Sequence, residues 1–443
     1  MYRWKILAAT ALAAMLFAET AAPPIWAREL QPLATALPEQ VGMSAERLGR
    51  ITTMLQKEIA RGKLPGAVVM VARKGKIVYS DAIGFQDKGE ETPMKLDSIF
   101  RIYSMTKPLV SVAAMMLVED GVIQLTDPVS KFLPAFKDML VSVATAGADG
   151  KITYANEPAA RPITVQDLLR HSAGLAYAEI TKNELVKAAY VEAKFSQPGI
   201  HEFDSRDMSP AEEVARIAKI PLIHQPGTVW EYSMAVDILG RVVEAASGER
   251  LSVFLDERLF KPLKMVDTGF WEPPSKISRL AQPLPVDPSS GLKTSVLDVS
   301  AEPKNDSGGA GGVSTAMDYL RFGEMLLNGG ELDGQRVLSR STIKLMTSDQ
   351  LGTRIAAPFE PGELLLGTPG YTFGLGFAVR QADGVAGVPG SAGEFMWAGY
   401  AGTFFWVDPQ EQIVGVYMTQ APSPMRAYYR KMIKALVYQG LVD

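Results

Sequence analysis

The feature that most constrains the fold is a long apolar segment that runs from Ser98 to Asp120 and stops at Gly121. Its apolar residues recur at the spacing of an α-helix, and a glycine just past the end is a typical helix stop. The predicted helix is apolar on nearly every face, so we expect it to lie buried at the centre of the protein. Ser104 and Lys107 stand near its start, where buried polar side chains are costly unless they serve a purpose.

Ser104 and Lys107 are three residues apart in the stretch Ser-Met-Thr-Lys, and residues at this spacing share one face of a helix. The hydroxyl and the amine can therefore meet without help from the rest of the fold, as a nucleophile and its base must. An amine acts as a base only while it is uncharged, which apolar surroundings favour. By itself the pair favours a helix-capping serine beside a lysine that extends to solvent over a catalytic pair.

Strand patterns lie at the two ends of the chain, and helical patterns lie in the middle. The β-rich runs are residues 66–72, 76–81, 373–381, 402–407 and 413–419. The helical runs are residues 44–61, 164–170, 210–219, 234–247, 251–259, 315–328 and 426–438. This order predicts an α/β (α+β) protein with an antiparallel sheet that is flanked by helices and discontinuous in sequence.

The expected domain organisation follows from that order. Residues 28–127 and 289–443 would form the α/β domain, and residues 128–288 would form an all-helical insertion. Residues 1–27 are typical of a Sec-type signal peptide, with Arg3 and Lys5 before a short apolar run and Ala27 as the expected last residue removed. We therefore expect a periplasmic or secreted protein with no integral membrane segment once the signal is removed.

Composition excludes several classes of function. The 443 residues carry a net charge of -4, and their Lys and Arg residues are scattered, which argues against nucleic-acid binding. The chain has no cysteine and therefore no disulfide and no thiolate metal site. Its three histidines, His171, His201 and His224, are isolated, and neither H-E-x-x-H nor G-x-S-x-G occurs. A Ser-His-Asp triad and a metal centre are thus poorly supported, and we expect no cofactor.

Two further groups would complete an acyl-transfer site around Ser104. Tyr232, just before a predicted helix, is the strongest candidate to carry a proton to the leaving group, although it is also compatible with a half-buried structural aromatic. An oxyanion requires two backbone amides, and the Ser104 amide is one candidate. Gly399 would let a strand pass close to Ser104 and offer the second. The Gly-rich stretch 307–312 is interpreted as a structural turn, because no Lys-Ser/Thr follows it.

These pieces together resemble the class C β-lactamase-like serine hydrolases, a superfamily that includes penicillin-binding D,D-peptidases and family VIII carboxylesterases. The resemblance extends over nearly the whole chain after the signal. It rests on five blocks in order: Phe100 to Pro108 around S-x-x-K, Gln124 to Val129, Ile163 to Leu175, Tyr232-Ser233, and Trp397-Ala398-Gly399 followed by Gly402 to Pro409.

The resemblance implies a role for each matching residue. Ser104 would be the acylated nucleophile, Lys107 its base and Tyr232 the proton shuttle. The amides of Ser104 and Tyr400 would form the oxyanion hole, and the site would lie in the cleft between the α/β and helical parts.

Two departures from the superfamily pattern point toward esters. Lactamases and peptidases carry K-T-G where this chain has Trp397-Ala398-Gly399, so the groups that hold a penicillin carboxylate are replaced by an apolar wall. Y-x-N has become Tyr232-Ser233-Met234, which replaces an amide by a thioether. A W-x-G block is what family VIII esterases show.

The sequence therefore predicts a serine carboxylesterase that hydrolyses short- to medium-chain carboxylic esters, with a small-molecule ester as its partner. A β-lactamase, a D,D-peptidase or amidase, an acyltransferase with the same nucleophile, and a non-catalytic penicillin-binding sensor remain alternatives.

Overall fold

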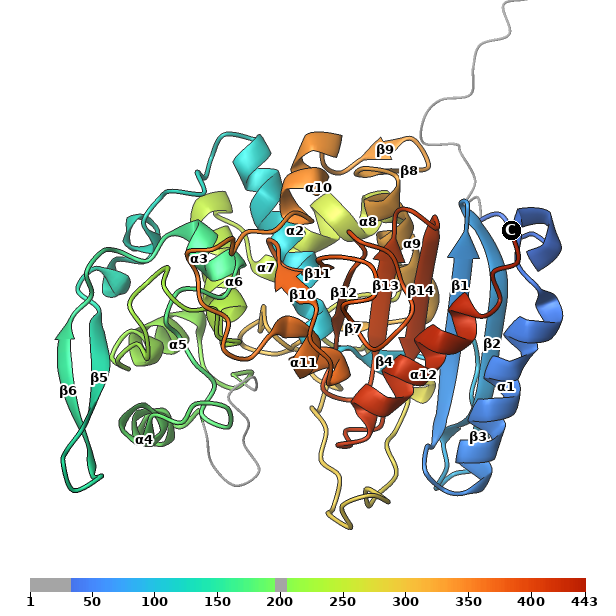
Figure 1. Ribbon diagram of the computed structural model, residues 1–443, viewed down its shortest axis with the longest axis horizontal. Coiled ribbons are helices and arrows are strands. Elements are labelled where there is room, and N and C mark those ends of the chain that lie inside the picture. Colours follow the sequence, from blue (N-terminus) through green and yellow to red (C-terminus); the bar gives the residue numbers. More distant parts are fainter. Residues whose placement is uncertain (1–32, 196–204) are drawn as a thin grey trace, which may run out of the picture. The chain divides into compact units, whose positions relative to one another are not determined.

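The fold is built around one large antiparallel sheet, seen in a computed structural model that describes residues 33–195 and 205–443 (Figure 1). The sheet has eight strands in the order β10-β11-β12-β13-β14-β1-β2-β3. The predicted signal peptide at residues 1–27 and His201 lie outside the described residues. The strands are β1 (Gly66–Arg73), β2 (Lys76–Asp87), β3 (Thr92–Pro93), β10 (Tyr371–Phe373), β11 (Ala378–Arg380), β12 (Phe395–Ala398), β13 (Phe404–Asp408) and β14 (Ile413–Met418).

The two ends of the chain meet in the middle of this sheet. β1 pairs with β14 in antiparallel register, from Val68 opposite Met418 to Arg73 opposite Ile413. β1 is buried along its whole length because it has a strand on each side and helices over its faces. The prediction of a discontinuous antiparallel sheet flanked by helices is therefore confirmed, whereas the predicted domain boundaries stay predictions.

Helices cover the sheet on both faces. α1 (Ala45–Ala60) and α12 (Arg426–Tyr438) pack together, and Arg47 of α1 donates to the Gln439 carbonyl just after α12 at 3.1 Å. α9 (Ala316–Leu327) packs against β13, β14 and β1. In Figure 1, α12 crosses in front of the sheet and α9 lies behind it.

The central helix is α2 (Thr106–Glu119), which is buried on nearly every face and packs against α6 (Ala235–Ser247) and α7 (Leu251–Leu255). The remaining helices are α3 (Val165–Leu169), α4 (Glu184–Glu192), α5 (Pro210–Ile217), α8 (Lys261–Leu263), α10 (Arg340–Met346) and α11 (Pro361–Leu366), with a π-helical turn at Asp256–Phe260. None of the helices within the described ranges is long and apolar enough to span a bilayer.

The predicted helix from Ser98 is wrong at its beginning. Residues Phe100–Arg101 form a short strand, β4, which pairs with β7 (Val313–Ser314), and Tyr103–Met105 form a 3₁₀ turn before α2 begins. The left-handed backbone of Tyr103, with φ of 45°, interrupts any helix that would run through it. The predicted end is confirmed, since the Gly121 amide donates to the Val118 carbonyl at 3.1 Å.

The sequence predicted an all-helical insertion in the middle of the chain, and this prediction is wrong. β5 (Leu140–Ala146) and β6 (Ile152–Pro158) form an antiparallel hairpin there. Their β-branched residues were the available signal for strands. The predicted single strand at 373–381 is likewise two strands, β10 and β11, because Gly376 adopts a φ of 96° and turns the chain between them.

Candidate active site

Ser104 lies in the 3₁₀ turn that leads into α2, and this turn is held from two sides. The Thr106 hydroxyl donates to the Tyr103 carbonyl at 2.6 Å and accepts from the Gly312 amide at 2.9 Å. The second bond comes from the Gly-rich loop, which acts as a structural element as predicted. The strained backbone before Ser104 is thus fixed by neighbours, as is common for a nucleophile at a sharp turn.

Tyr232 contacts Ser104 directly. Its hydroxyl donates to the Ser104 Oγ at 2.6 Å, across 128 residues of sequence. The ring of Tyr232 packs against Trp397 and Tyr177, with centroid distances of 5.5 and 5.2 Å. The structure therefore brings together the predicted nucleophile and the predicted proton shuttle.

Lys107 is buried beside them, with 1% of its surface exposed. Its Nζ donates to the Tyr177 hydroxyl at 3.0 Å and to the Gly309 carbonyl at 2.9 Å, and it lies 4.7 Å from the centroid of the Tyr232 ring. Among the described residues no hydrogen bond joins Lys107 to Ser104. The two side chains instead meet the same tyrosine, Ser104 at its hydroxyl and Lys107 at its ring.

The loop that supplies the Gly309 carbonyl is anchored by α6. Buried Asp237 accepts hydrogen bonds from the Ser307 hydroxyl at 2.6 Å and from the Gly309 amide at 3.0 Å. Because the Gly309 carbonyl is one of the two acceptors for Lys107, this anchor fixes the direction of the amine.

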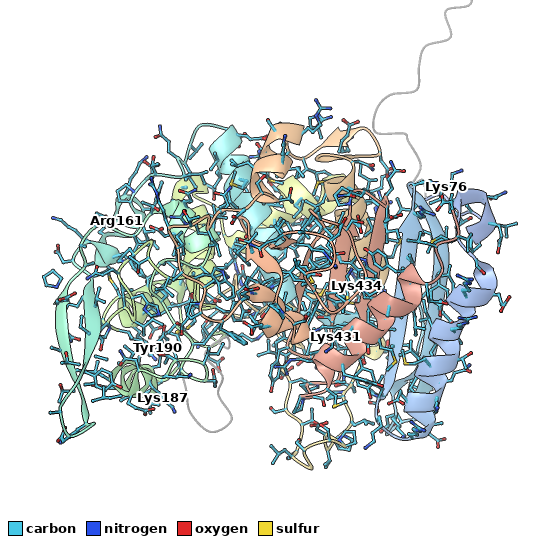
Figure 2. All side chains as sticks on the ribbon, in the orientation of Figure 1. Lys76, Arg161, Lys187, Tyr190, Lys431 and Lys434 are labelled. Carbon is cyan, nitrogen blue, oxygen red and sulfur yellow. The ribbon has the colours of Figure 1, made fainter. Side chains whose placement is uncertain are left out.

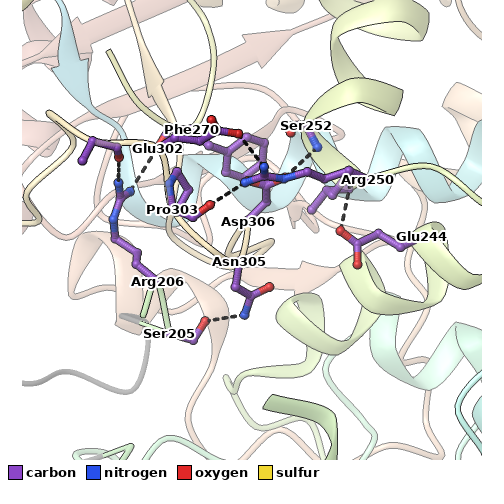
Figure 3. Close-up of polar contacts among 12 residues, drawn as sticks. Ser205, Arg206, Glu244, Arg250, Ser252, Phe270, Glu302, Pro303, Asn305 and Asp306 are labelled. Atoms are coloured by element: carbon purple, nitrogen blue, oxygen red, sulfur yellow. Dashed lines mark hydrogen bonds and ion pairs between the residues drawn. The ribbon is translucent and has the colours of Figure 1, made fainter. Parts of the chain in front are cut away.

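A second network holds the start of the same loop (Figure 3). Arg250 forms a bidentate pair with Asp306, with both N–O distances at 2.8 Å, and the Ser252 amide donates to Asp306 at 3.0 Å. Asn305 donates to the Ser205 hydroxyl at 3.1 Å. Planar bidentate pairs restrict the movement of both partners, so the start of the loop that supplies the Gly309 carbonyl to Lys107 is held in place.

Ser104, Tyr232, Ala398, Gly399 and Tyr400 line one pocket of roughly 300 Å³. Apolar side chains of Ile180, Leu364 and Leu365 contribute to its wall. A neighbouring cavity of roughly 880 Å³ shares Ile180, Tyr232 and Leu364 with it and extends to Ile152 and Tyr154 of the β5–β6 hairpin. The site is thus a mainly apolar pocket, with Glu179, Arg426 and Arg430 also in its lining, beside a larger cavity.

Trp397 and Met234 do not line this pocket, contrary to the prediction that they would face the substrate. Side chains alternate along a strand, so Ala398 faces the pocket while Trp397 points the other way. Trp397 packs against Phe373 at a centroid distance of 5.4 Å and supports Tyr232 from behind. Met234 precedes α6 and is fully buried in the core.

Gly399 lies where two backbones approach closely. A side chain there would collide with the Ile102 carbonyl, two residues before Ser104, and with the Thr403 hydroxyl. The predicted close passage of this strand is therefore confirmed, and it places Tyr400 in the wall of the Ser104 pocket.

His171 lies next to the site without contacting Ser104. It is fully buried, and its Nδ1 lies 3.2 Å from the Ser233 hydroxyl. Burial, and then the charge of Lys107, hold the pKa of His171 well below 6.5. His224 is bonded to Glu231 at 2.9 Å. Neither of these two histidines forms a triad with Ser104, and within residues 33–195 and 205–443 no cluster of three His, Asp or Glu residues could hold a metal ion.

The low pKa of His171 predicts a pH-dependent stability. The folded protein keeps this imidazole uncharged, whereas the unfolded chain protonates it near pH 6.5. As the pH falls below about 6.5, the free energy of unfolding should therefore decrease, by up to about 1.4 kcal/mol per pH unit for one proton. Denaturant unfolding between pH 5 and 8 measures the slope, which His171→Asn should reduce. Equal slopes in wild type and His171→Asn would contradict the assignment.

Sequence reasoning missed several residues of the site. Tyr177 follows the block that ends at Leu175, and its hydroxyl on Lys107 was not foreseen. Arg426 and Arg430 belong to a helix that was predicted with the correct ends, yet nothing in its pattern showed that the helix reaches the pocket.

Comparisons with known proteins agree with this geometry. The family model described as Beta-lactamase matches residues 51–439. Protein Rv1367c of Mycobacterium tuberculosis is 35% identical over 368 residues, which cover 81% of this chain and 86% of that protein. Esterase EstB of Burkholderia gladioli is 32% identical over 383 residues, with coverages of 82% and 88%. The solved structure of EstCE1, described as a hydrolase with promiscuous acyltransferase activity, is similar with a TM-score of 0.72 at 27% identity, covering 89% of this chain and 99% of that one.

Proposed function

The chain belongs to the beta-lactamase family and is a serine hydrolase, and on that premise we propose that it is a carboxylesterase for short- to medium-chain carboxylic esters. The observation that carries the proposal is the 2.6 Å hydrogen bond from Tyr232 to Ser104 inside an apolar pocket. The name of its relative Esterase EstB supports the same class of substrate.

The reaction proceeds through an acyl-enzyme on Ser104. The Ser104 Oγ attacks the ester carbonyl while its proton passes to the Tyr232 oxygen, and Tyr232 gives its own proton to Lys107, the base. The first transfer is supported by the contact of the Tyr232 hydroxyl with Ser104, whereas the second requires the Lys107 Nζ to turn from the Tyr232 ring toward the phenol oxygen. The proton then returns through Tyr232 to the departing alcohol. Water attacks the acyl-enzyme in the second half, with the same two residues acting again.

The negative charge that develops on the ester oxygen needs two donors. We assign them to the backbone amides of Ser104 and Tyr400, two residues that line the pocket. The close approach at Gly399 supports this assignment, because it lets the strand carry Tyr400 to the Ser104 turn.

The residues at the K-T-G position support esters over penicillins as substrates. Ala398 offers neither charge nor a side-chain donor, and Trp397 is turned into the core. The larger cavity under the β5–β6 hairpin gives room for an acyl chain or an alcohol group. We also propose that residues 1–27 direct export, so that the enzyme acts in the periplasm or outside the cell.

Parallel assays of the purified enzyme test the ester assignment. We expect p-nitrophenyl butyrate to be turned over with a far higher kcat/KM than nitrocefin, and an acyl-length series to peak at short to medium chains. A much better turnover of nitrocefin would show a lactamase instead. A burst of one product per enzyme without a steady state would show a sensor that stays acylated.

Acyl transfer to an alcohol is a second candidate function. It is favoured by the apolar lining around Ser104, which can hold an alcohol in the place of water, and by the activity named for EstCE1. Adding a short alcohol to the ester assay and quantifying the new ester against the free acid measures the partition of the acyl-enzyme.

A further inference from the structure

His171 contacts the residue before Tyr232, the residue after it and the ring of Tyr232 itself. Its carbonyl accepts from the Glu231 amide at 3.0 Å, and its Nδ1 lies 3.2 Å from the Ser233 hydroxyl. The centroid of its ring lies 5.1 Å from that of the Tyr232 ring. His171 is not among the described residues that line the Ser104 pocket or the larger cavity, so it can act on the reaction only through the residues that it holds.

The imidazole of His171 also joins Tyr232 to the sheet. It lies edge-on to Phe373 of β10 at a centroid distance of 5.5 Å and is stacked with Trp397 of β12 at 6.5 Å. Trp397 in turn lies 5.5 Å from the Tyr232 ring. Aromatic rings at these distances and angles attract one another, which limits the tilt of each ring. The His171 ring therefore links Tyr232 to the strand that brings Ala398 into the pocket wall.

The backbone around His171 is held in an unusual conformation. Its φ of 55° lies in the left-handed region, which residues other than glycine seldom adopt. The buried Asp167 carboxylate holds the residues on both sides, since it accepts from the Arg170 guanidinium and the Ser172 hydroxyl, each at 3.0 Å. Arg161, labelled in Figure 2, donates to both oxygens of that carboxylate at 2.6 and 3.0 Å. Backbone strain of this kind persists only where the surroundings enforce it, and it clusters at active sites.

The contact with Ser233 is one that an uncharged imidazole makes. The Ser233 Oγ accepts from the Ala235 amide at 3.4 Å, so its own proton is available for donation to the His171 Nδ1. In this arrangement the proton of the ring is on Nε2. Burial, and then the charge of Lys107, keep the pKa of His171 well below 6.5, so the ring stays uncharged at neutral pH and the contact is kept.

We propose that His171 is a positioning residue for the proton shuttle, because it holds the Tyr232 hydroxyl within hydrogen-bond distance of Ser104. The role depends on the proposed esterase reaction, in which Tyr232 carries the proton. The two oxygens lie 2.6 Å apart, and a general base acts only within such reach of the proton that it accepts. Without the imidazole, the Tyr232 ring loses its support on one side, and its hydroxyl can tilt away from Ser104.

The test is a double-mutant cycle between positions 171 and 232. The first-turnover rate and KM for p-nitrophenyl butyrate are measured in wild type, His171→Asn, Tyr232→Phe and the double variant. The rate at which a fluorophosphonate labels Ser104 is measured in the same four proteins, because it does not depend on the natural substrate. Asparagine lacks the imidazole but tolerates the left-handed backbone, so the turn is kept.

Two serine variants accompany the cycle. Ser233→Ala removes only the hydroxyl that is bonded to the His171 Nδ1, so it keeps the test available if His171→Asn does not fold. Its matched control is Ser111→Ala, which removes a buried hydroxyl that has no partner within the described residues.

With Tyr232 present, His171→Asn should slow both acylation reactions about tenfold or more, because small misplacements of reacting groups are costly, and KM should stay within about twofold. Ser233→Ala should slow them about threefold, and Ser111→Ala should leave them unchanged. In Tyr232→Phe the same changes at positions 171 and 233 should alter the rates by less than about twofold, because no hydroxyl is left to position.

Equal losses with and without the Tyr232 hydroxyl, or a wild-type rate in folded His171→Asn, would overturn the positioning role. If His171→Asn does not fold, equal losses from Ser233→Ala in the two backgrounds would overturn it. Absence of ester turnover in wild type, with the expected pattern of labelling rates, would overturn the esterase function and leave the positioning role supported.

Discussion

Replacing Ser104 by alanine is expected to abolish ester turnover, with a loss in kcat of roughly four orders of magnitude or more. No acyl-enzyme can form without the hydroxyl, and what remains is catalysis by the oxyanion donors alone. The fold should persist, because among the described residues the Ser104 hydroxyl makes one side-chain hydrogen bond, to Tyr232. Losing it should cost about 1 kcal/mol. Steady-state turnover of p-nitrophenyl butyrate and a thermal melt measure the two effects.

Ser111→Ala is the matched control for this experiment. Ser111 lies on the same helix, α2, is fully buried, and its hydroxyl has no hydrogen-bond partner within the described residues. This variant should keep its turnover, so a loss caused merely by disturbing α2 would show up in both variants. Ester turnover of Ser104→Ala near the wild-type rate would mean that another group is acylated.

Replacing Tyr232 by phenylalanine is expected to lower kcat by about 10² to 10⁴ while the protein stays folded. The substitution removes the oxygen that contacts Ser104 but keeps the ring, which packs 5.5 Å from Trp397 and 4.7 Å from the Lys107 amine. The acyl-enzyme should form slowly, because the proton has lost its path from Ser104 to Lys107. Rapid-mixing assays of the first turnover measure this step separately from deacylation.

Tyr177→Phe tests which of the two tyrosines of the site, Tyr177 or Tyr232, is the proton shuttle. The Tyr177 hydroxyl accepts from Lys107 at 3.0 Å and has no hydrogen bond to Ser104 among the described contacts, so its loss should reduce activity less than the loss of the Tyr232 hydroxyl. A larger loss of activity in Tyr177→Phe than in Tyr232→Phe would show that Tyr232 is not the proton shuttle.

The parts of the site that the sequence predicted are those whose chemistry is local. Spacing placed Ser104 and Lys107 close together in the chain, but the direct contact that it predicted between hydroxyl and amine is absent from the described hydrogen bonds. Gly399 lies where two backbones come close, which a glycine in the motif could indicate. The sheet was predictable in the same way, because hairpins such as β13–β14 depend on neighbouring residues. The observed start of α2 at Thr106 was not predictable in this way, because it depends on the pairing of β4 with β7, which are distant in sequence.

The parts that the sequence did not predict depend on which way a side chain points. Trp397 was expected in the substrate wall, yet strand alternation turns it toward Phe373 and gives the pocket Ala398. Arg426 reaches the pocket only because α12 packs against the sheet beside β14. Such contacts between segments are set by packing of the whole core, and a pattern along the chain does not contain them.

The central claim is that a single serine, activated through Tyr232 and Lys107, carries the acyl group. Labelling the active enzyme with a fluorophosphonate and mapping the adduct by peptide mass spectrometry tests it most directly, with Ser104→Ala as the unlabelled control. We predict one adduct per chain, on Ser104, that forms in step with the loss of ester turnover. An adduct on any other side chain, or full activity after Ser104 is labelled, would contradict the account.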